Sequence, residues 1–158
     1  MGYLIFGLRL AAGTLLLVAG VLKAHDGATS TAVTIAGYRI LPQALVAPLA
    51  VGLPYFEIML GGYLAIGLFT RIAGWIAAGQ FAIFAVAVGS LVVRNIPADC
   101  GCFGSSLPTP PSWGHVAVDV LLACIAAAIA LRGPGAFAVD RMLFPSGYFT
   151  AEREAHSP

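Results

Sequence analysis

Four long runs of apolar residues limit what this chain can fold into. They occupy residues 3–22, 45–69, 72–93 and 115–131. The hydrocarbon core of a bilayer is about 30 Å thick, so a helix needs about 20 apolar residues to cross it. Charged residues make up only 9% of the chain, against about 25% in soluble globular domains. Because backbone groups in lipid must be bonded within their own segment, the sequence predicts an all-α integral membrane protein with a four-transmembrane-helix bundle.

The chain has room for one bundle and a short extension. We expect residues 1–135 to form a single four-helix transmembrane domain. Residues 136–158 are expected to form a segment on the membrane surface followed by a disordered cytoplasmic tail. The polar stretch 24–42 is typical of a loop, with a short helix over residues 32–41. The formal net charge is +1 and no basic stripe with interleaved aromatic residues is present, so the expected partner is the lipid bilayer and not nucleic acid.

Small residues and short connections indicate how the helices pack. Only Thr70 and Arg71 separate the second and third apolar runs, which predicts an antiparallel helical hairpin. Gly13, Gly20 and Gly74 lack side chains that would hold neighbouring helices apart. We therefore expect close helix contacts at these three glycines.

The segment with sequence DCGCFG, residues 99–104, carries two cysteines one residue apart. A disulfide between Cys100 and Cys102 requires their α-carbons to lie within about 4.4–6.8 Å, which a tight turn at Gly101 allows. So small a ring is strained and easily reduced, which favours thiol exchange over a structural staple. A structural loop with two buried thiols and a metal clip are the alternatives that the spacing leaves open.

Glu57 is the carboxylate nearest the middle of a predicted span. A carboxylate inside a membrane faces the bundle interior or water, and by default it marks a functional site. Arg9 or Lys23 is the expected counter-charge, although Arg9 can instead snorkel to an interface and Lys23 lies where the first run ends. An ion pair that only fixes helix register is the alternative. Gln80 is expected to make an interhelical hydrogen bond.

Several polar residues flank the cysteine segment in the sequence. Arg94 would favour a cysteine thiolate, whereas Asp99 would oppose it. His115 and Asp119 are spaced i, i+4 at the start of the fourth run, so the carboxylate can orient the imidazole for proton transfer or metal binding. A solvated helix entrance is the alternative for this pair. Cys124, further along the same run, is expected to fill space.

Basic residues near the span ends predict the orientation of the chain. Five lie at the end that holds the termini, and three lie at the end that holds the cysteine pair: Arg9, Arg71, Arg132, Arg141 and Arg153 against Lys23, Arg39 and Arg94. We expect the protein to lie in the inner (plasma) membrane, and the surplus of basic residues predicts that both termini are cytoplasmic. The cysteine loop is then extracytoplasmic, where disulfides persist.

From about Arg9 to Arg132 the chain resembles the MauE family of methylamine-utilisation membrane proteins, within the wider group of four-helix DoxX-like proteins. The resemblance rests on Arg9 and Lys23 in the early helix, on the stretch 54–61 that contains Glu57, and above all on residues 99–104. It implies a membrane protein that works with a thioredoxin-like partner to mature the disulfide-rich small subunit of methylamine dehydrogenase. In relatives it implies the transfer of electrons between extracytoplasmic thiols and a membrane carrier.

Disulfide-generating membrane enzymes of the four-helix type use two cysteine pairs, whereas this chain has one pair and the distant Cys124. The pair therefore exchanges directly with a thioredoxin-fold partner, or a membrane quinone approaches it without an intermediate pair. The leading hypothesis is redox chemistry at Cys100 and Cys102 through a mixed disulfide, without a bound metal. The alternatives are Cu(I) handling by the cysteines with His115 or His25, and a non-catalytic membrane subunit or assembly factor.

Overall fold

The computed structural model describes residues 2–102, 104, 109–135 and 137–143 as an all-helical protein. In chain order its helices are α1 (Gly2–Asp26), α2 (Ala28–Gly37), α3 (Gln43–Ile66), α4 (Thr70–Val93), α5 (Trp113–Arg132) and α6 (Val139–Leu143). Four of them, α1, α3, α4 and α5, are long and apolar enough to cross a membrane. The predicted four-helix membrane bundle is confirmed, and the protein is a multi-pass membrane protein. The expected tail and Arg153 lie outside the described residues.

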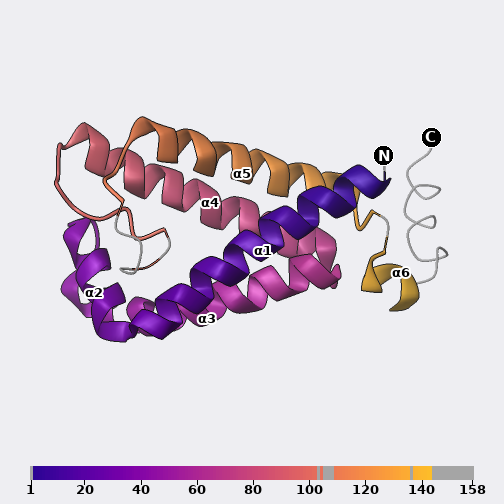
Figure 1. Ribbon diagram of the computed structural model, residues 1–158, viewed down its shortest axis with the longest axis horizontal. Helices are drawn as coiled ribbons and strands as arrows, with labels where there is room; N and C mark the ends of the chain where they lie inside the picture. Colours follow the sequence, from indigo (N-terminus) through magenta and orange to yellow (C-terminus); the bar gives the residue numbers. More distant parts are fainter. Residues whose placement is uncertain (1, 103, 105–108, 136, 144–158) are drawn as a thin grey trace, which may run out of the picture.

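The bundle is built from two tightly packed pairs of helices, α1 with α3 and α4 with α5. The predicted hairpin exists as α3 and α4, which are joined by a short turn, but the two helices make few contacts with each other. They lie close at the turn and diverge toward the other end of the bundle, where α2 and the cysteine loop are found (Figure 1). This divergence leaves room for a groove beside the cysteines.

Glycines set the close approach within each pair. A β-carbon on Gly13 would lie 2.8 Å from the carbonyl oxygen of Gly61 on α3. One on Gly20 would lie 2.6 Å from the carbonyl oxygen of Pro54, and one on Gly74 would lie 2.9 Å from the β-carbon of Ala130 on α5. The close contacts expected at these glycines are therefore confirmed.

Large apolar side chains cover the outside of the bundle as well as its core. A buried cluster that includes Leu16, Leu64 and Phe81 joins the helix pairs. Outside it, side chains such as Ile83 and Val86 are 67% and 73% exposed. An apolar outer surface of this extent suits contact with lipid chains and not with water.

Arg9 lies at the end of the bundle that holds the termini, and it is fully buried. Its Nη1 donates to the carbonyl oxygen of Pro134, and its Nη2 donates to that of Phe137 at 3.0 Å. The expectation that Arg9 pairs with Glu57 is wrong, because Lys23 is the partner of Glu57. That Arg9 snorkels stays a prediction. The chain after α5 folds back over α1, and its carbonyl groups supply acceptors for Nη1 and Nη2, while Nε has no hydrogen-bond partner among the described residues.

Asp140 ties α6 to the bundle. Its two carboxylate oxygens accept hydrogen bonds from the backbone N–H groups of Phe69, at 2.7 Å, and Thr70, at 2.8 Å. These donors begin α4 and have no partner within that helix, so a carboxylate stabilises the helix start. The expected surface segment 136–144 is thus anchored to the α3–α4 turn over its described part, residues 137–143.

The glycine contacts generate a prediction with a control in the same helix. Gly13→Ala should lower the free energy of unfolding by about 1–3 kcal/mol, because its methyl group meets backbone atoms of α3 that cannot move aside. Gly7→Ala is the control, since a β-carbon at Gly7 meets nothing within 4 Å. Thermal unfolding of both variants in detergent checks this. Equal melting temperatures for the two would show that α1 and α3 do not pack at Gly13.

Candidate functional site

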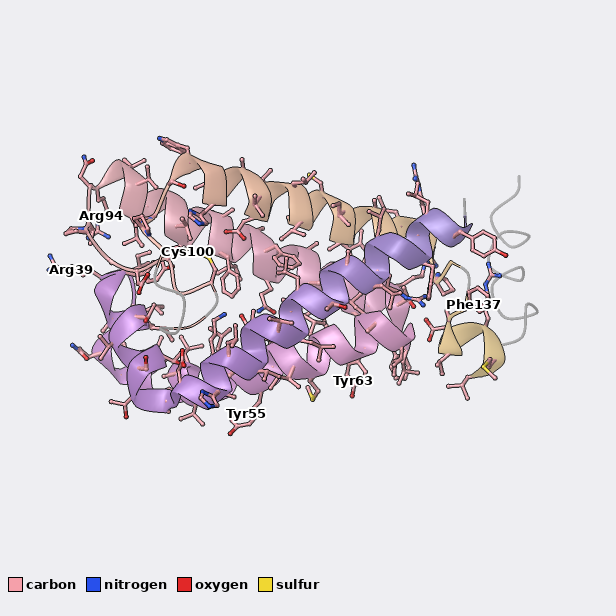
Figure 2. All side chains as sticks on the ribbon, in the orientation of Figure 1. Arg39, Tyr55, Tyr63, Arg94, Cys100 and Phe137 are labelled. Carbon is pink, nitrogen blue, oxygen red and sulfur yellow. A yellow bond between two sulfur atoms is a disulfide. The ribbon has the colours of Figure 1, made fainter. Side chains whose placement is uncertain are left out.

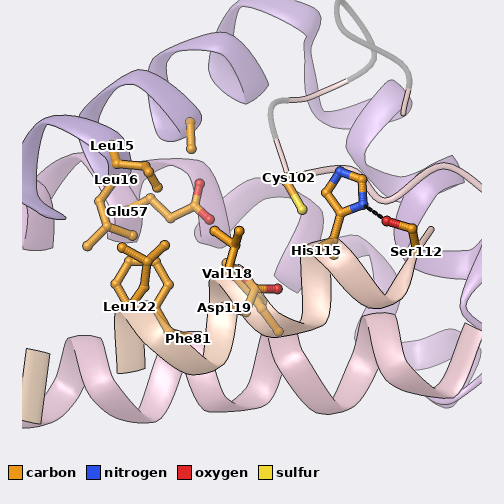
Figure 3. Close-up of a pocket in the computed structure, with 13 residues that line it drawn as sticks. Leu15, Leu16, Glu57, Phe81, Cys102, Ser112, His115, Val118, Asp119 and Leu122 are labelled. Atoms are coloured by element: carbon orange, nitrogen blue, oxygen red, sulfur yellow. Dashed lines mark hydrogen bonds between the residues drawn. The ribbon is translucent and has the colours of Figure 1, made fainter. Parts of the chain in front are cut away.

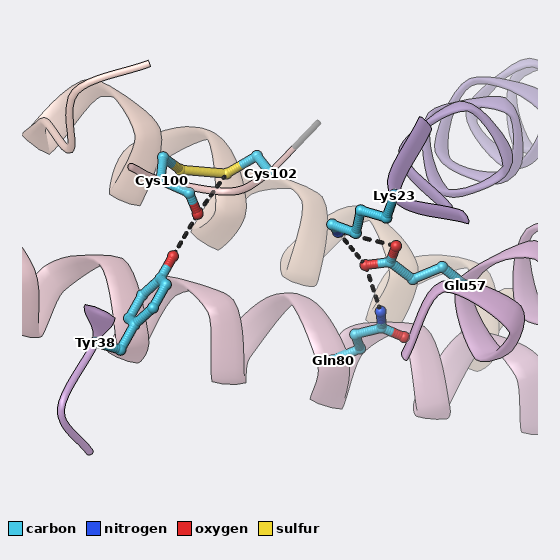
Figure 4. A network of polar contacts seen from close by, with 6 residues as sticks. All are labelled: Lys23, Tyr38, Glu57, Gln80, Cys100 and Cys102. Atoms are coloured by element: carbon cyan, nitrogen blue, oxygen red, sulfur yellow. Dashed lines mark hydrogen bonds and ion pairs between the residues drawn. A yellow bond between two sulfur atoms is a disulfide. The ribbon is translucent and has the colours of Figure 1, made fainter. Parts of the chain in front are cut away.

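Cys100 and Cys102 are joined by a disulfide (Figure 4). Figure 2 places Cys100 toward the end of the bundle that holds α2, opposite α6. Their α-carbons are 5.5 Å apart, within the usual range. The chain turns at Gly101, where φ is +64° and an added β-carbon would collide with Thr34 of α2. Cys100 is 3% exposed, whereas Cys102 is only partly buried. The two sulfur atoms therefore differ in how easily a reagent from outside can reach them.

Hydrogen bonds that involve neither sulfur hold the cysteine loop. The Asp99 carboxylate accepts from the Thr109 N–H at 2.7 Å, and the Cys100 N–H donates to the Thr109 carbonyl at 3.0 Å. The Tyr38 hydroxyl donates to the Cys100 carbonyl, while Arg94 donates to the Tyr38 carbonyl at 3.0 Å. In these bonds Arg94 and Asp99 position the loop backbone. The predicted opposition of their charges on a thiolate stays a prediction.

Tyr38, directly after α2, was not singled out from the sequence. Burial, followed by the nearby carboxylates of Asp119 and Asp99, raises its pKa to about 12. The hydroxyl thus keeps its proton at neutral pH and remains a donor to the Cys100 carbonyl. A single tyrosine in a loop gives no sequence signal for this role, because its partner is 62 residues away.

A buried ion pair lies deeper in the bundle than the disulfide (Figure 4). Lys23 Nζ lies 2.6 Å and 2.9 Å from the two carboxylate oxygens of Glu57, and Gln80 Nε2 donates to the first of them at 3.3 Å. Lys23 is 3% exposed and Glu57 is fully buried. Of the two predicted counter-charges, Lys23 is confirmed and Arg9 is wrong, and the Gln80 hydrogen bond is confirmed. Lys23 points into the bundle three residues before α1 ends at Asp26, and its place at an interface stays a prediction.

A cavity of about 470 Å³ lies on one side of the disulfide, between α1 and α5. We call it the α1–α5 cavity; Figure 3 shows its lining, which includes Leu16, Glu57, Phe84, Cys102, His115 and Asp119. Asp119 is 7% exposed, and within the described part of the chain its Oδ2 has no hydrogen-bond partner. The structure thus brings an unpartnered carboxyl oxygen, an imidazole and the more accessible cysteine to one cavity.

His115 is oriented by a different residue from the one predicted. Its Nδ1 lies 2.8 Å from the hydroxyl oxygen of Ser112, just before α5 (Figure 3). The expectation that Asp119 orients the ring has no support in the described contacts, since Asp119 faces the cavity one turn deeper. Both side chains can still exchange protons with a group in that cavity.

A groove of about 490 Å³ lies on the other side of the disulfide, between α3 and α4 and below α2. We call it the α3–α4 groove, and Lys23, Tyr38, Leu53, Ile83, Val86, Ala87, Cys100 and Cys102 are among its lining residues. Phe84 and Cys102 line both this groove and the α1–α5 cavity. The disulfide therefore forms part of the wall between two cavities.

The remaining candidate residues lie apart from this wall. The His25 side chain is 85% exposed, and its Nδ1 is 3.9 Å from a carboxylate oxygen of Asp26. Cys124 is exposed on α5, so the expectation that it fills space inside the bundle is wrong. Among the described residues, no three His, Cys, Asp or Glu side chains are grouped so that they could hold a metal ion.

Comparisons with known proteins agree with the sequence resemblance. The family model described as "Methylamine utilisation protein MauE" matches residues 1–132. The curated methylamine utilization protein MauE of Paracoccus denitrificans is 33% identical over 100 residues, which cover 63% of this chain and 54% of that protein. The chain thus spans about half the length of the curated relative that it matches. No solved structure matches the chain.

The buried ion pair generates a prediction that a double-mutant cycle can check. Glu57→Ala or Lys23→Ala alone should lower the free energy of unfolding by about 3–5 kcal/mol, because each leaves an unpaired buried charge. The double variant should lose less than the sum of the two, since neither charge remains. Arg9→Ala combined with Glu57→Ala is the control and should be additive. Additive losses for Lys23 and Glu57 in detergent unfolding would contradict the pairing.

Proposed function

This chain belongs to the methylamine utilisation protein MauE family, and from that premise we propose that it exchanges thiols and disulfides with an extracytoplasmic protein. Cys100 and Cys102 carry the reaction, and the partner is a thioredoxin-fold protein. The exchange serves the maturation of disulfide-bonded proteins used in methylamine utilisation. The observation that carries the proposal is the asymmetric disulfide, in which Cys100 is buried and Cys102 is partly buried beside the α1–α5 cavity.

The asymmetry gives each cysteine a separate role. A partner thiolate attacks the accessible Cys102 sulfur, forming a mixed disulfide and releasing Cys100 as a thiolate. The second partner thiol then attacks the mixed disulfide, so that the partner becomes oxidised and both cysteines become thiols. In the reverse direction, the Cys102 thiolate attacks a partner disulfide and Cys100 resolves the intermediate.

The loop supports exchange because it does not depend on the disulfide for its shape. Asp99, Thr109 and Tyr38 hold its backbone through hydrogen bonds that remain when the sulfur atoms separate. The stabilisation that a disulfide provides increases with the number of residues in the loop that it closes. Here the two cysteines enclose only Gly101. The disulfide therefore contributes little as a staple.

Asp119 and His115 are suited to moving the protons of the reaction. Each exchange releases or takes up a proton at sulfur, and both side chains line the cavity that Cys102 also lines. Asp119 Oδ2, which has no hydrogen-bond partner among the described residues, is our candidate to bind that proton. We assign these two residues to proton exchange and Cys102 to nucleophilic attack.

The exposed basic residues support the orientation. Arg71, Arg132 and Arg141 are exposed at the end that holds the termini, and Arg39 and Arg94 at the end that holds the cysteine loop. Arg9 and Lys23 are buried and bonded inside the bundle, so they contribute little to the positive-inside bias. The termini then face the cytoplasm across the plasma membrane, and the cysteine pair faces the extracytoplasmic space.

This proposal predicts that one cysteine variant traps its partner. In a Cys124→Ser background, Cys100→Ser should accumulate a mixed disulfide, because Cys102 attacks and no resolving thiol remains. Cys102→Ser should trap much less, since Cys100 is buried. Acid quenching, non-reducing gels and mass spectrometry of the band check this, and the variant without both cysteines is the control. Asp119→Asn, added to Cys100→Ser, should slow trapping.

The same experiment tests the orientation. An exported protein in the dithiothreitol-sensitive band is the expected result. A cytosolic protein in that band would overturn the orientation. The absence of a band from both single variants would overturn the exchange itself.

A further inference from the structure

We propose that the α3–α4 groove binds a membrane quinone, which accepts two electrons from Cys100 and Cys102. This inference rests on the proposed thiol exchange and adds its electron acceptor and its direction. Electrons then flow from the partner's thiols to the cysteine pair and from there to the quinone. The proposal rests on one observation: both cysteines line a groove between the diverging helices α3 and α4, and the outer walls of that groove face lipid.

The groove is accessible from the membrane because its outer walls belong to the lipid-facing surface. Leu49 of α3 is 39% exposed, and Ile83 and Val86 of α4 are 67% and 73% exposed. These residues belong to the halves of α3 and α4 that are far from the connecting turn, where the two helices diverge (Figure 1). A molecule dissolved in the bilayer can therefore reach the groove sideways without crossing water.

The inner end of the groove carries the reactive atoms and the polar groups that a quinone head needs. Cys100, Cys102, Tyr38 and Lys23 line it together. A quinone carbonyl oxygen accepts hydrogen bonds, and a lysine ammonium has three N–H donors. Two donors of Lys23 point at the carboxylate oxygens of Glu57. The ammonium also lies 5.2 Å from the centre of the Phe84 ring, which lines the same groove. We assign the third donor to a quinone oxygen beside the disulfide.

The size and character of the remaining surface fit a ring with an apolar tail. The volume of about 490 Å³ lies within the range of small-molecule sites. Leu53, Phe84 and Ala87 are among the apolar residues that line the groove together with the cysteines. A phospholipid chain or an apolar peptide from a partner could also fill such a groove. Neither can accept electrons from the thiols that the exchange leaves behind, and so we assign the groove to a quinone.

The redox step balances with the quinone as oxidant. The two thiols lose two electrons and two protons as the bond between the sulfur atoms forms. The quinone gains two electrons and two protons and leaves as a hydroquinone. Cys102 lines both cavities, whereas Cys100 lines only the α3–α4 groove. We therefore assign exchange with the partner to the α1–α5 cavity side and transfer to the quinone to the groove side.

The test uses the purified full chain in detergent, in a Cys124→Ser background, reduced and freed of reductant. Decylubiquinone is added, hydroquinone formation is followed by absorbance, and disulfide formation is followed by the mass shift on alkylation. The expected result is one hydroquinone per disulfide formed. Ala87→Phe, which fills the groove, should slow the reaction about tenfold or more.

Gly79→Phe is the matched control. It adds the same side chain on α4 at a position where a β-carbon meets nothing within 4 Å and which does not line the groove. Its rate should stay close to that of the parent protein. Equal rates for Ala87→Phe and Gly79→Phe, with both variants monodisperse and of unchanged melting temperature, would overturn the groove as the quinone site.

A second arm separates this inference from the proposed function. Oxidised glutathione replaces decylubiquinone in the same assay. Oxidation of the pair by glutathione disulfide but not by decylubiquinone would overturn the quinone and leave thiol exchange standing. Failure with both oxidants would overturn thiol exchange and the quinone inference together.

Discussion

A charge buried in a lipid-embedded bundle must be paired, and the Lys23–Glu57 ion pair meets that requirement here. Lys23 comes from α1, Glu57 from α3, and Gln80 of α4 completes the cluster. The cluster thus connects the α1–α3 pair of helices to the α4–α5 pair, which otherwise contact each other little along α3 and α4. It lies beneath the disulfide, with Glu57 lining one cavity and Lys23 the other.

The cysteine pair takes its properties from where this scaffold places it. Where α3 and α4 diverge (Figure 1), Cys100 and Cys102 line the lipid-facing α3–α4 groove, and Cys102 also lines the α1–α5 cavity. The side chains of Asp99 and Tyr38 bond the loop backbone, and in our proposal this holds the loop in place while the sulfur atoms change oxidation state. In our proposal, a soluble partner on one side and a membrane-dissolved oxidant on the other use this one pair in turn, without a second cysteine pair.

The sequence predicted those parts of the structure that depend on local composition. Apolar runs gave the four spans, and the burial cost of Glu57 pointed to a basic partner and narrowed it to Arg9 or Lys23. The choice between these two depended on which part of α1 lies beside Glu57 of α3. The spacing of apolar residues in the sequence does not specify this. Tyr38 and Asp140 were missed because their partners lie far away in the sequence and are largely backbone groups, which carry no sequence signal.

A redox titration of the purified chain tests most directly whether Cys100 and Cys102 form an exchangeable pair on a constant scaffold. Cys124→Ser protein is equilibrated with mixtures of reduced and oxidised dithiothreitol, and the oxidised fraction is read from the mass shift on alkylation. We expect a reversible two-electron transition, in which the ratio of oxidised to reduced protein changes about tenfold per 30 mV. We also expect the helical content to be the same in both forms. A pair that is reduced only when the helices unfold would contradict these expectations, since the disulfide would then be a structural staple.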